Sequence, residues 1–162
     1  MSLVSVYAPT NTSDYEAKRK FYKALHEKIK AISKRDLMIM GGDLNARVGY
    51  DEDIWEWRNI IGIYAADTIN ENGHLLLDLC TAQNLSIENT FFRHGSSGSW
   101  KHPRSKKWHQ IDHFLLRKNN LIRTQKCYID KNADCCSDHR LLVMKLTIKL
   151  KKNLIKKHIT KI

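Results

Sequence analysis

The stretch LMIMGGDLN, residues 37–45, joins an apolar run to two glycines, a carboxylate and a carboxamide. A short apolar run that ends in glycine is typical of a strand buried on both faces. Because side chains alternate along an extended chain, Asp43 and Asn45 are predicted to point the same way beyond this strand. An aspartate can orient or deprotonate water, and an asparagine can donate a hydrogen bond to a phosphate oxygen. We therefore interpret the stretch as a core strand that presents catalytic groups; an ordinary turn is the alternative.

The segments around this stretch predict two helices and several strands. Ser13 and Glu16 form an S-x-x-E capping box, and apolar residues follow at positions 21, 25, 29 and 32, which is helical spacing. We expect strands at residues 3–7, 37–42, 86–92, 110–117, 124–129 and 141–150, a second helix from residues 70–73, and a polar loop at 93–107. The order, β-α-β-α and then β-rich, favours sheet layers with helices outside.

The size and composition are those of one globular domain. The chain has 162 residues, of which 42% are hydrophobic and 28% charged. No apolar stretch approaches the roughly 20 residues of a membrane helix, and no signal peptide is evident, so we expect an intracellular protein, with the nucleus as a candidate compartment. The four cysteines are therefore expected to be reduced thiols. A zinc site is an alternative for Cys127, Cys135, Cys136 and His139.

The charge is strongly positive, at +11 with a pI near 9.6. Residues 145–162 contain seven lysines and no acidic residue. We divide the chain into a domain at 1–150 and a basic tail at 151–162. A basic chain of this kind is attracted to polyanions such as nucleic acid, although a solvated tail would have the same composition.

Two later segments carry further candidates for chemistry. Asp112 lies within the apolar strand 111–116, where a carboxylate is costly unless it is paired. Asp138 and His139 come just before the last apolar strand, and histidine transfers protons near neutral pH. Asp112 is the candidate that orients His139, and Asp138 is a candidate ligand of metal or water. A salt-bridged aspartate and a surface histidine are the alternatives.

A fourth candidate is Tyr7, at the end of the first strand, whose phenol can bind phosphate but which is also a natural core residue. His113 is predicted to face away from Asp112, so we leave it out of the site. Together, the segments Tyr7-Ala8-Pro9-Thr10, Gly42-Asp43-Leu44-Asn45, Ile111-Asp112-His113-Phe114 and Ser137-Asp138-His139 resemble the motifs of the endonuclease/exonuclease/phosphatase superfamily. Within it, the likeness is to LINE-type retrotransposon endonucleases and craniofacial development protein 2-like sequences. It covers the chain from Val6 to about Leu146.

The resemblance implies an α+β fold, a four-layer α/β/β/α sandwich like that of deoxyribonuclease I. It also implies Mg²⁺-dependent phosphodiester hydrolysis, with Mn²⁺ as an alternative metal and DNA as the partner of a monomeric enzyme. The implied roles are water activation by Asp43, phosphate contacts by Asn45 and Tyr7, transition-state stabilisation by His139 held by Asp112, a water-mediated metal contact by Asp138, and nucleic-acid contacts by Trp100 and Arg47.

The sequence departs from the family pattern at its start. In the family, two further motifs precede the tyrosine strand, and one supplies a glutamate that binds Mg²⁺. We therefore expect a domain that is incomplete at its N-terminus, unstable or prone to aggregate in isolation, and impaired in catalysis. The acidic residues 51–53 are expected to form a solvated loop and not to replace that glutamate. A catalytically dead, nucleic-acid-binding remnant of a retrotransposon endonuclease is the first alternative, and a phosphatase for small molecules or lipids is the second.

Overall fold

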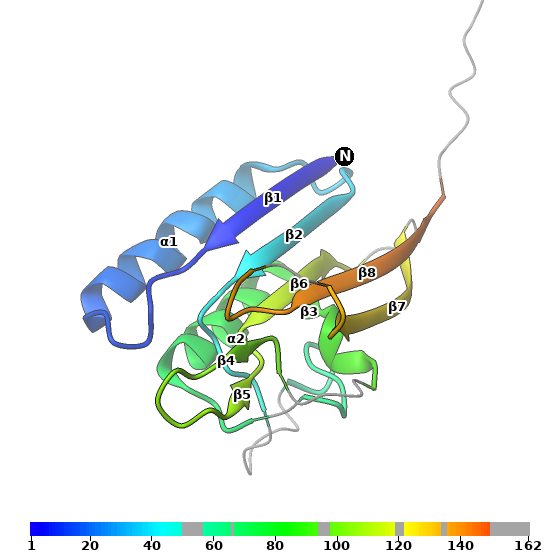
Figure 1. Ribbon diagram of the computed structural model, residues 1–162. Helices are drawn as coiled ribbons and strands as arrows, with labels where there is room; N and C mark the ends of the chain where they lie inside the picture. Colours follow the sequence, from blue (N-terminus) through cyan, green and yellow to red (C-terminus); the bar gives the residue numbers. More distant parts are fainter. Residues whose placement is uncertain (50–56, 66, 94–97, 119–121, 134–135, 150–162) are drawn as a thin grey trace, which may run out of the picture.

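A computed structural model describes residues 1–49, 57–65, 67–93, 98–118, 122–133 and 136–149 (Figure 1). The predicted tail at 151–162, the acidic residues 51–53 and Cys135 lie outside these ranges. The elements are β1 (Ser2–Tyr7), α1 (Tyr15–Ala31), β2 (Met38–Asp43), α2 (Glu71–Gln83), β3 (Leu85–Ile87), the 3₁₀ helix η2 (Glu88–Phe91), β4 (Trp100–Lys101), β5 (Trp108–His109), β6 (Asp112–Arg117), β7 (Ile122–Asp130) and β8 (Leu141–Ile148). The predicted α+β class is confirmed.

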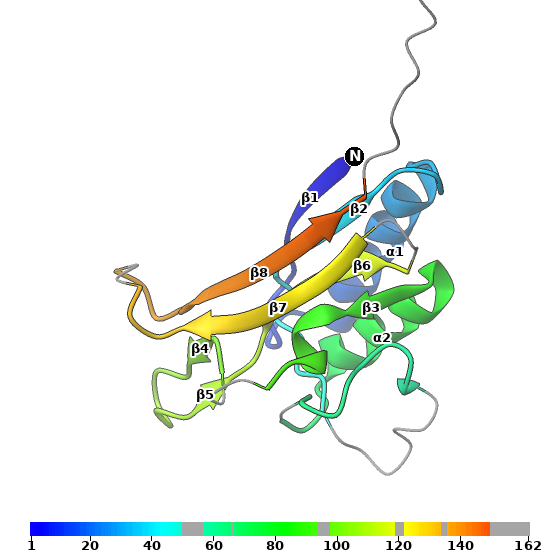
Figure 2. The same cartoon turned by 90° about the vertical axis from the view of Figure 1, so that its right-hand side faces the viewer.

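The central sheet has four strands in the order β1-β2-β6-β3. β1 pairs with β2 in parallel, and β6 runs antiparallel to both β2 and β3. Helices α1 and α2 cover one face of this sheet, and the β7–β8 hairpin lies on the other face (Figure 2). The described residues thus form three layers: helices, a four-stranded sheet and a two-stranded sheet. Within them, no helix has the length and apolar character needed to cross a membrane.

The core lies between the helices and the central sheet. Alternate residues of the strands point into it, among them Val6, Met40 and Leu115, all of which are buried. Helix α1 contributes Leu25 and Ile29, at the spacing that brings residues onto one helix face. Each such buried side chain stabilises the fold by about 1.5–3 kcal/mol. These contacts fix the sheet whose strand ends carry the candidate site.

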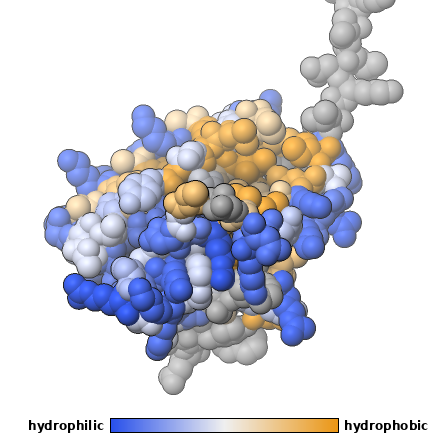
Figure 3. All heavy atoms as spheres, viewed as in Figure 1, coloured by the Kyte–Doolittle hydropathy of each residue, from blue (hydrophilic) through white to orange (hydrophobic). Residues whose placement is uncertain are grey.

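The opposite face of the central sheet is only partly covered. Leu3 on β1 is 69% exposed, whereas Ile39 and Phe114 are half-buried. Figure 3 shows hydrophobic side chains gathered over the region between β1 and β8. The β7–β8 hairpin closes part of this face with Cys127 and Ile129, which are buried. Part of this face therefore exposes apolar side chains, and the expected instability and aggregation stay predictions.

The structure differs from three predictions of local structure. Helix α1 is capped by Asp14, whose side chain accepts a hydrogen bond from the Ala17 amide at 2.9 Å, so Ser13 is not the cap. The strand predicted at 86–92 ends at Ile87 and continues as η2. Thr90 donates its hydroxyl to the Ile87 carbonyl at 2.6 Å, a local bond that competes with strand pairing. The loop predicted at 93–107 also contains the short strand β4.

Candidate functional site

Three of the predicted site residues lie in one row across the end of the central sheet. Tyr7 is the register partner of Asp43 in the β1–β2 pair, and Asp43 is the partner of Asp112 in the β2–β6 pair. Register partners on adjacent strands project from the same face of a sheet. This is the face toward β7–β8, opposite the helices. Residues from three distant parts of the sequence therefore meet at one edge.

The two glycines before Asp43 allow the strands to approach closely here. Gly42 has φ +149°, and a Cβ on it would lie 1.9 Å from the Val6 carbonyl oxygen. A side chain is excluded by both the backbone angle and the neighbouring strand. A Cβ on Gly41 would meet the Phe114 ring at 2.7 Å. The glycines thus seat β2 between β1 and β6 and set the row of functional residues.

Asp112 extends the row to His139. The Asp112 carboxylate lies 3.0 Å from Nδ1 of His139, and both side chains are less than one-third exposed. His139 belongs to the loop before β8. This loop pairs with β4 through a bridge between Trp100 and His139. The Arg140 amide also donates to the Ser99 carbonyl at 2.6 Å. When Nδ1 donates to Asp112, Nε2 is the nitrogen that can act on a substrate.

The Asp43 carboxyl has a raised pKa. Burial is the main cause, and the neighbouring Asp112 carboxylate raises the pKa further, while the hydrogen bond from the Asn45 amide at 2.8 Å lowers it. A carboxyl with a raised pKa accepts a proton more readily than an ordinary aspartate. This raised pKa supports the predicted role of Asp43 in activating water, which stays a prediction.

Asn45 contacts Asp43, as the sequence predicts, but its backbone is not the extended strand that the prediction assumed. Its backbone is left-handed, with φ 47°, so the segment is a turn and not an extended strand. The Asn45 side-chain amide donates to the Ala8 carbonyl at 2.9 Å and lies 3.4 Å from the second Asp43 oxygen. Asparagine is among the residues that most readily take this conformation. Asn45 thus fixes the Asp43 carboxylate and ties it to the end of β1.

Asp138 faces Trp100. The indole Nε1 donates to the Asp138 carboxylate at 2.7 Å, and this hydrogen bond is the main cause of the lowered pKa of Asp138. Asp138 is otherwise exposed. Asp138, which the sequence analysis gave as a metal ligand, therefore contacts Trp100, which it gave as a nucleic-acid contact.

A Mg²⁺ ion would find oxygen donors but no complete cage in the described residues. Asp112 and Asp138 both act on the charge of Asp43, so the three carboxylates share one region. Across the described ranges, however, no three His, Cys, Asp or Glu side chains gather closely enough to hold an ion. Mg²⁺ binds oxygen and commonly keeps several waters with one or two carboxylates. Asp138 stays the predicted ligand of such a water-rich site, which the described residues form only in part.

A cavity of about 370 Å³ lies next to residues that adjoin the row, since Asn45 contacts Asp43 and Ile111 precedes Asp112. Asn45 and Arg47 line it together with three rings, those of Trp100, His102 and His109. The Trp100 ring centroid lies 5.4 Å from that of His102 and 6.2 Å from that of His109. The predicted nucleic-acid residues Trp100 and Arg47 therefore share one pocket beside the row.

Asp67 and His109 form a second histidine–carboxylate pair, which the sequence reasoning missed. The Asp67 carboxylate lies 2.5 Å from Nδ1 of His109, and its other oxygen lies 3.7 Å from Arg47. The two residues are 42 positions apart, so no local pattern links them. The only local signal was that His109 lies three residues before Asp112 in the sequence.

His113 lies on the helix side of the sheet, as predicted, and is fully buried. Its Nε2 lies 2.8 Å from the Ala46 carbonyl, and its Nδ1 lies 3.1 Å from the Asn89 amide. These contacts hold the segment that follows Asn45. His113 thus supports the site from the core without facing it.

Comparison with known proteins gives two curated relatives. The chain is 32% identical over 153 residues to craniofacial development protein 2 of Bos taurus and, equally, to that of Tragulus javanicus. The match covers 93% of this chain, which spans about a quarter of the length of these relatives: 25% and 26%. No protein-family model matches the chain.

Solved structures share the architecture. The 3′ phosphatase NExo from Neisseria, bound to a product DNA hairpin, matches with TM-score 0.64 at 15% identity, over 90% of this chain and 60% of that one. The chain has the endonuclease/exonuclease/phosphatase fold. A protein of that name from Bacteroides vulgatus matches with TM-score 0.50 at 16% identity, over 83% and 45% of the two chains. A mannosyl-6-phosphatase from Bacteroides thetaiotaomicron gives the same TM-score and identity, over 83% and 47%. The resemblance and the deoxyribonuclease I-like fold predicted from the sequence are confirmed.

Proposed function

We propose that the chain carries the hydrolytic site of a Mg²⁺-dependent phosphodiesterase that cuts DNA. The observation that carries this proposal is the row Tyr7–Asp43–Asp112, continued by the 3.0 Å contact from Asp112 to His139. The row combines a base, an oriented histidine and a phenol at one strand end. Hydrolysis of a phosphate ester needs these groups: one to activate water and others to stabilise charge on phosphate oxygens.

Each side chain has a role that follows from its surroundings. Asp43 takes a proton from the attacking water, because burial raises its pKa. His139 donates from Nε2 to a phosphate oxygen, while Asp112 fixes its ring and stabilises the imidazolium. Tyr7 is 73% exposed, so its hydroxyl is accessible to a phosphate oxygen. Bound Mg²⁺ would neutralise phosphate charge, with Asp138 as the candidate ligand through water.

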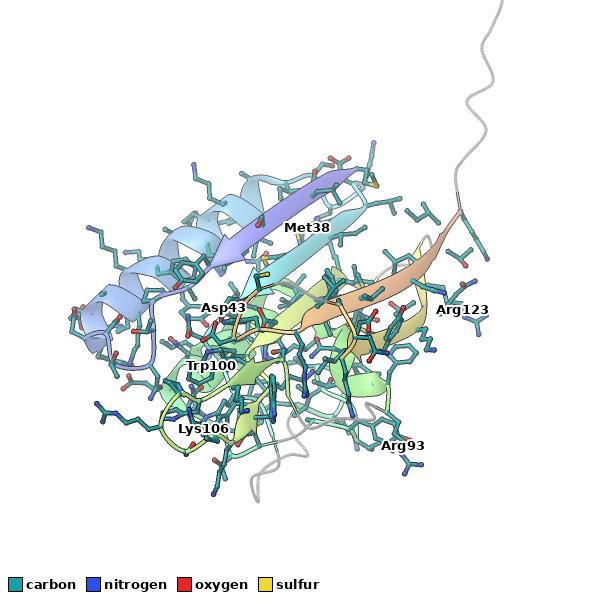
Figure 4. The ribbon with its side chains drawn as sticks, viewed as in Figure 1. Met38, Asp43, Arg93, Trp100, Lys106 and Arg123 are labelled. Atoms are coloured by element: carbon teal, nitrogen blue, oxygen red, sulfur yellow. The ribbon has the colours of Figure 1, made fainter. Side chains whose placement is uncertain are left out.

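The charge next to the row favours nucleic acid over a small substrate. The β4–β5 hairpin carries four exposed basic residues: Lys101, Arg104, Lys106 and Lys107. Figure 4 shows Lys106 at the turn of this hairpin, pointing away from the body of the protein. The Arg140 guanidinium stacks over the Trp108 ring at 3.4 Å, which adds a fifth cation. Neutralising phosphates with such cations provides most of the sequence-independent affinity for DNA.

A second candidate function is DNA binding without turnover. It is favoured by the lack, among the described residues, of three clustered metal ligands. The basic hairpin would act in the same way in both functions, so binding alone does not separate them.

The test is incubation of the purified chain with supercoiled plasmid and Mg²⁺, beside Asp43→Ala. Asp78→Ala is the matched control, because Asp78 is an exposed carboxylate on α2, on the opposite side of the sheet. Because the sequence predicts impaired catalysis, we expect slow nicking by the wild type and by Asp78→Ala, and a rate at least about a hundredfold lower in Asp43→Ala.

Two outcomes would overturn the proposal. Salt-sensitive DNA binding with no nicking under Mg²⁺ or Mn²⁺ would favour the second candidate. Release of inorganic phosphate from a 3′-phosphorylated oligonucleotide, without nicking, would identify a phosphatase that uses the same groups.

A further inference from the structure

The β7–β8 hairpin has two chemically different faces. Cross-strand partners share a face, and the pairs Cys127–Met144 and Ile129–Leu142 point toward the central sheet. Cys127 and Ile129 are buried there, and burial raises the pKa of the Cys127 thiol to about 12. This inner face is the one that holds the hairpin on the domain.

The opposite side, which we name the outer hairpin face, carries four residues of each strand: Arg123, Lys126, Tyr128 and Asp130 on β7, and Leu141, Val143, Lys145 and Thr147 on β8. Tyr128, Asp130 and Val143 are half-buried, and the other five are exposed. Figure 4 shows Arg123 pointing outward from β7. The face looks away from the central sheet, and therefore away from the row of candidate catalytic residues.

The register puts two like charges directly opposite each other on this face. Lys126 is the cross-strand partner of Lys145, beside a β-bulge between Thr124 and Lys126. Like charges in this position destabilise a sheet. None of the ion pairs formed within the described residues includes Arg123, Lys126 or Lys145. The folded chain keeps this repulsion between the two lysines, and an anion bound from outside would reduce it.

The acidic residue of this face is distant from the lysine pair. Asp130 lies at the other end of β7, four residues from Lys126, which is about 13 Å along a strand. Lys126 also has its ammonium 4.7 Å from the centre of the Tyr128 ring. Beyond β8 the sequence continues with Lys149 and five more lysines up to residue 161. The positive charge is therefore continuous in sequence from the outer hairpin face onward.

We propose that the outer hairpin face is a second DNA-binding surface, which contacts the phosphate backbone of duplex DNA apart from the site of cleavage. An exposed two-stranded ribbon is narrow enough to follow a groove of duplex DNA. Lys145 lies six residues beyond His139, at most about 20 Å along the strand, which corresponds to roughly six base pairs of duplex. The inference takes DNA as the substrate from the proposed function, but it does not require cleavage.

The experiment measures duplex binding in EDTA, where no hydrolysis occurs. Fluorescence anisotropy of a 24-base-pair duplex is recorded between 50 and 200 mM NaCl for the wild type and for Lys126→Gln/Lys145→Gln. The control is Lys20→Gln/Lys23→Gln, which removes the same charge from exposed positions of α1, on the helix side of the sheet. We expect the slope of log K against log[salt] to fall by about two units in the hairpin variant and to stay unchanged in the control.

Thermal melts test whether the variants fold like the wild type. Because the lysine pair is repulsive, Lys126→Gln/Lys145→Gln should melt at the same temperature as the wild type or above it. Equal loss of slope in both variants would overturn the proposal in favour of general charge attraction. An unchanged slope in the hairpin variant would overturn it as well, and if binding of polyglutamate falls instead, the face serves an acidic protein. Failure of the plasmid assay alone would overturn the proposed hydrolysis and leave this surface standing.

Discussion

Asp43 lies directly opposite Asp112 in the antiparallel register of β2 and β6. Asp112 contacts the imidazole of His139, whereas Asp43 is held by amide donors from Asn45. Because the two environments differ, we expect the two carboxylates at this strand end to have different roles. The paired one orients a histidine, and the other, with its raised pKa, can accept a proton.

Replacing Asp43 by asparagine should stabilise the metal-free protein while abolishing hydrolysis. The folded-state pKa of Asp43 is raised, so the ionised carboxylate costs stability at neutral pH, and an uncharged amide removes that cost. The gain in the free energy of unfolding should be complete above the raised pKa and should vanish as the pH falls to the unfolded value of about 3.9. Thermal melts of Asp43→Asn and wild type in EDTA, at pH 7 and at pH 4, measure it.

Asp138→Asn should change thermal stability in the opposite direction, by lowering it at pH 7. The pKa of Asp138 is lowered because Trp100 donates a hydrogen bond to the carboxylate, so its ionised form favours the folded state. Its substitution should lower the melting temperature slightly at pH 7, by less than in a buried pair because Asp138 is exposed.

If Asp43→Asn melts below the wild type at pH 7, the proposed electrostatics of the row are wrong.

Removing Asp112 and His139 together should cost little more than removing either one. The two act as a unit, because Asp112 only positions the ring that His139 contributes. We expect His139→Ala and Asp112→Ala each to lower the rate of plasmid nicking about a hundredfold or more, and the double variant to match His139→Ala within about threefold. Rates that multiply across the two substitutions would mean that the residues act independently.

Gly42→Ala should be far more destabilising than Gly41→Ala. At Gly42 both the φ of +149° and the Val6 backbone oxygen oppose a methyl group. At Gly41 the obstacle is the Phe114 ring, a side chain that can turn aside. We expect a loss of about 1–3 kcal/mol or more in the free energy of unfolding for Gly42→Ala and a smaller loss for Gly41→Ala, measured by urea unfolding. Equal losses would count against the strand geometry described for β2.

The sequence predicted those parts of the fold that local signals determine. The apolar run before Gly41 identified β2, and the apolar segment around residues 111–116 identified β6. The alternation of side chains along a strand put Asp112 on one face and His113 on the other. Helix α2 begins after Asn70, as expected, because the Asn70 side chain caps the Gly73 amide at 2.8 Å. The bounds of Ile122–Asp130 differ from those expected by a residue or two, because cooperative pairing with β8 extends the strand.

What the sequence could not predict depends on contacts between distant residues. Lys18, a lysine of α1, is 2% exposed because Glu71 and the Asn11 carbonyl both bind its ammonium group. Asp67 and His109 meet only after the sheet brings their loops together. Asn45 was expected to point with Asp43 by strand alternation, yet a left-handed turn makes the contact. In each case tertiary structure overrides the local pattern.

Trp100 should separate two kinds of contribution, because its ring and its indole N–H serve different partners. Trp100→Phe keeps an aromatic ring beside His102 and His109 but removes the hydrogen bond to Asp138. The pKa of Asp138 should then rise toward that of an ordinary aspartate, which carboxyl ¹³C shifts in an NMR titration would show. Binding of a single-stranded oligonucleotide should change little in Trp100→Phe but weaken roughly tenfold to a hundredfold in Trp100→Ala, since a base stacked on an aromatic side chain contributes about 1–3 kcal/mol. Equal binding by the two variants would show that the ring does not contact nucleic acid and that Trp100 acts only through Asp138.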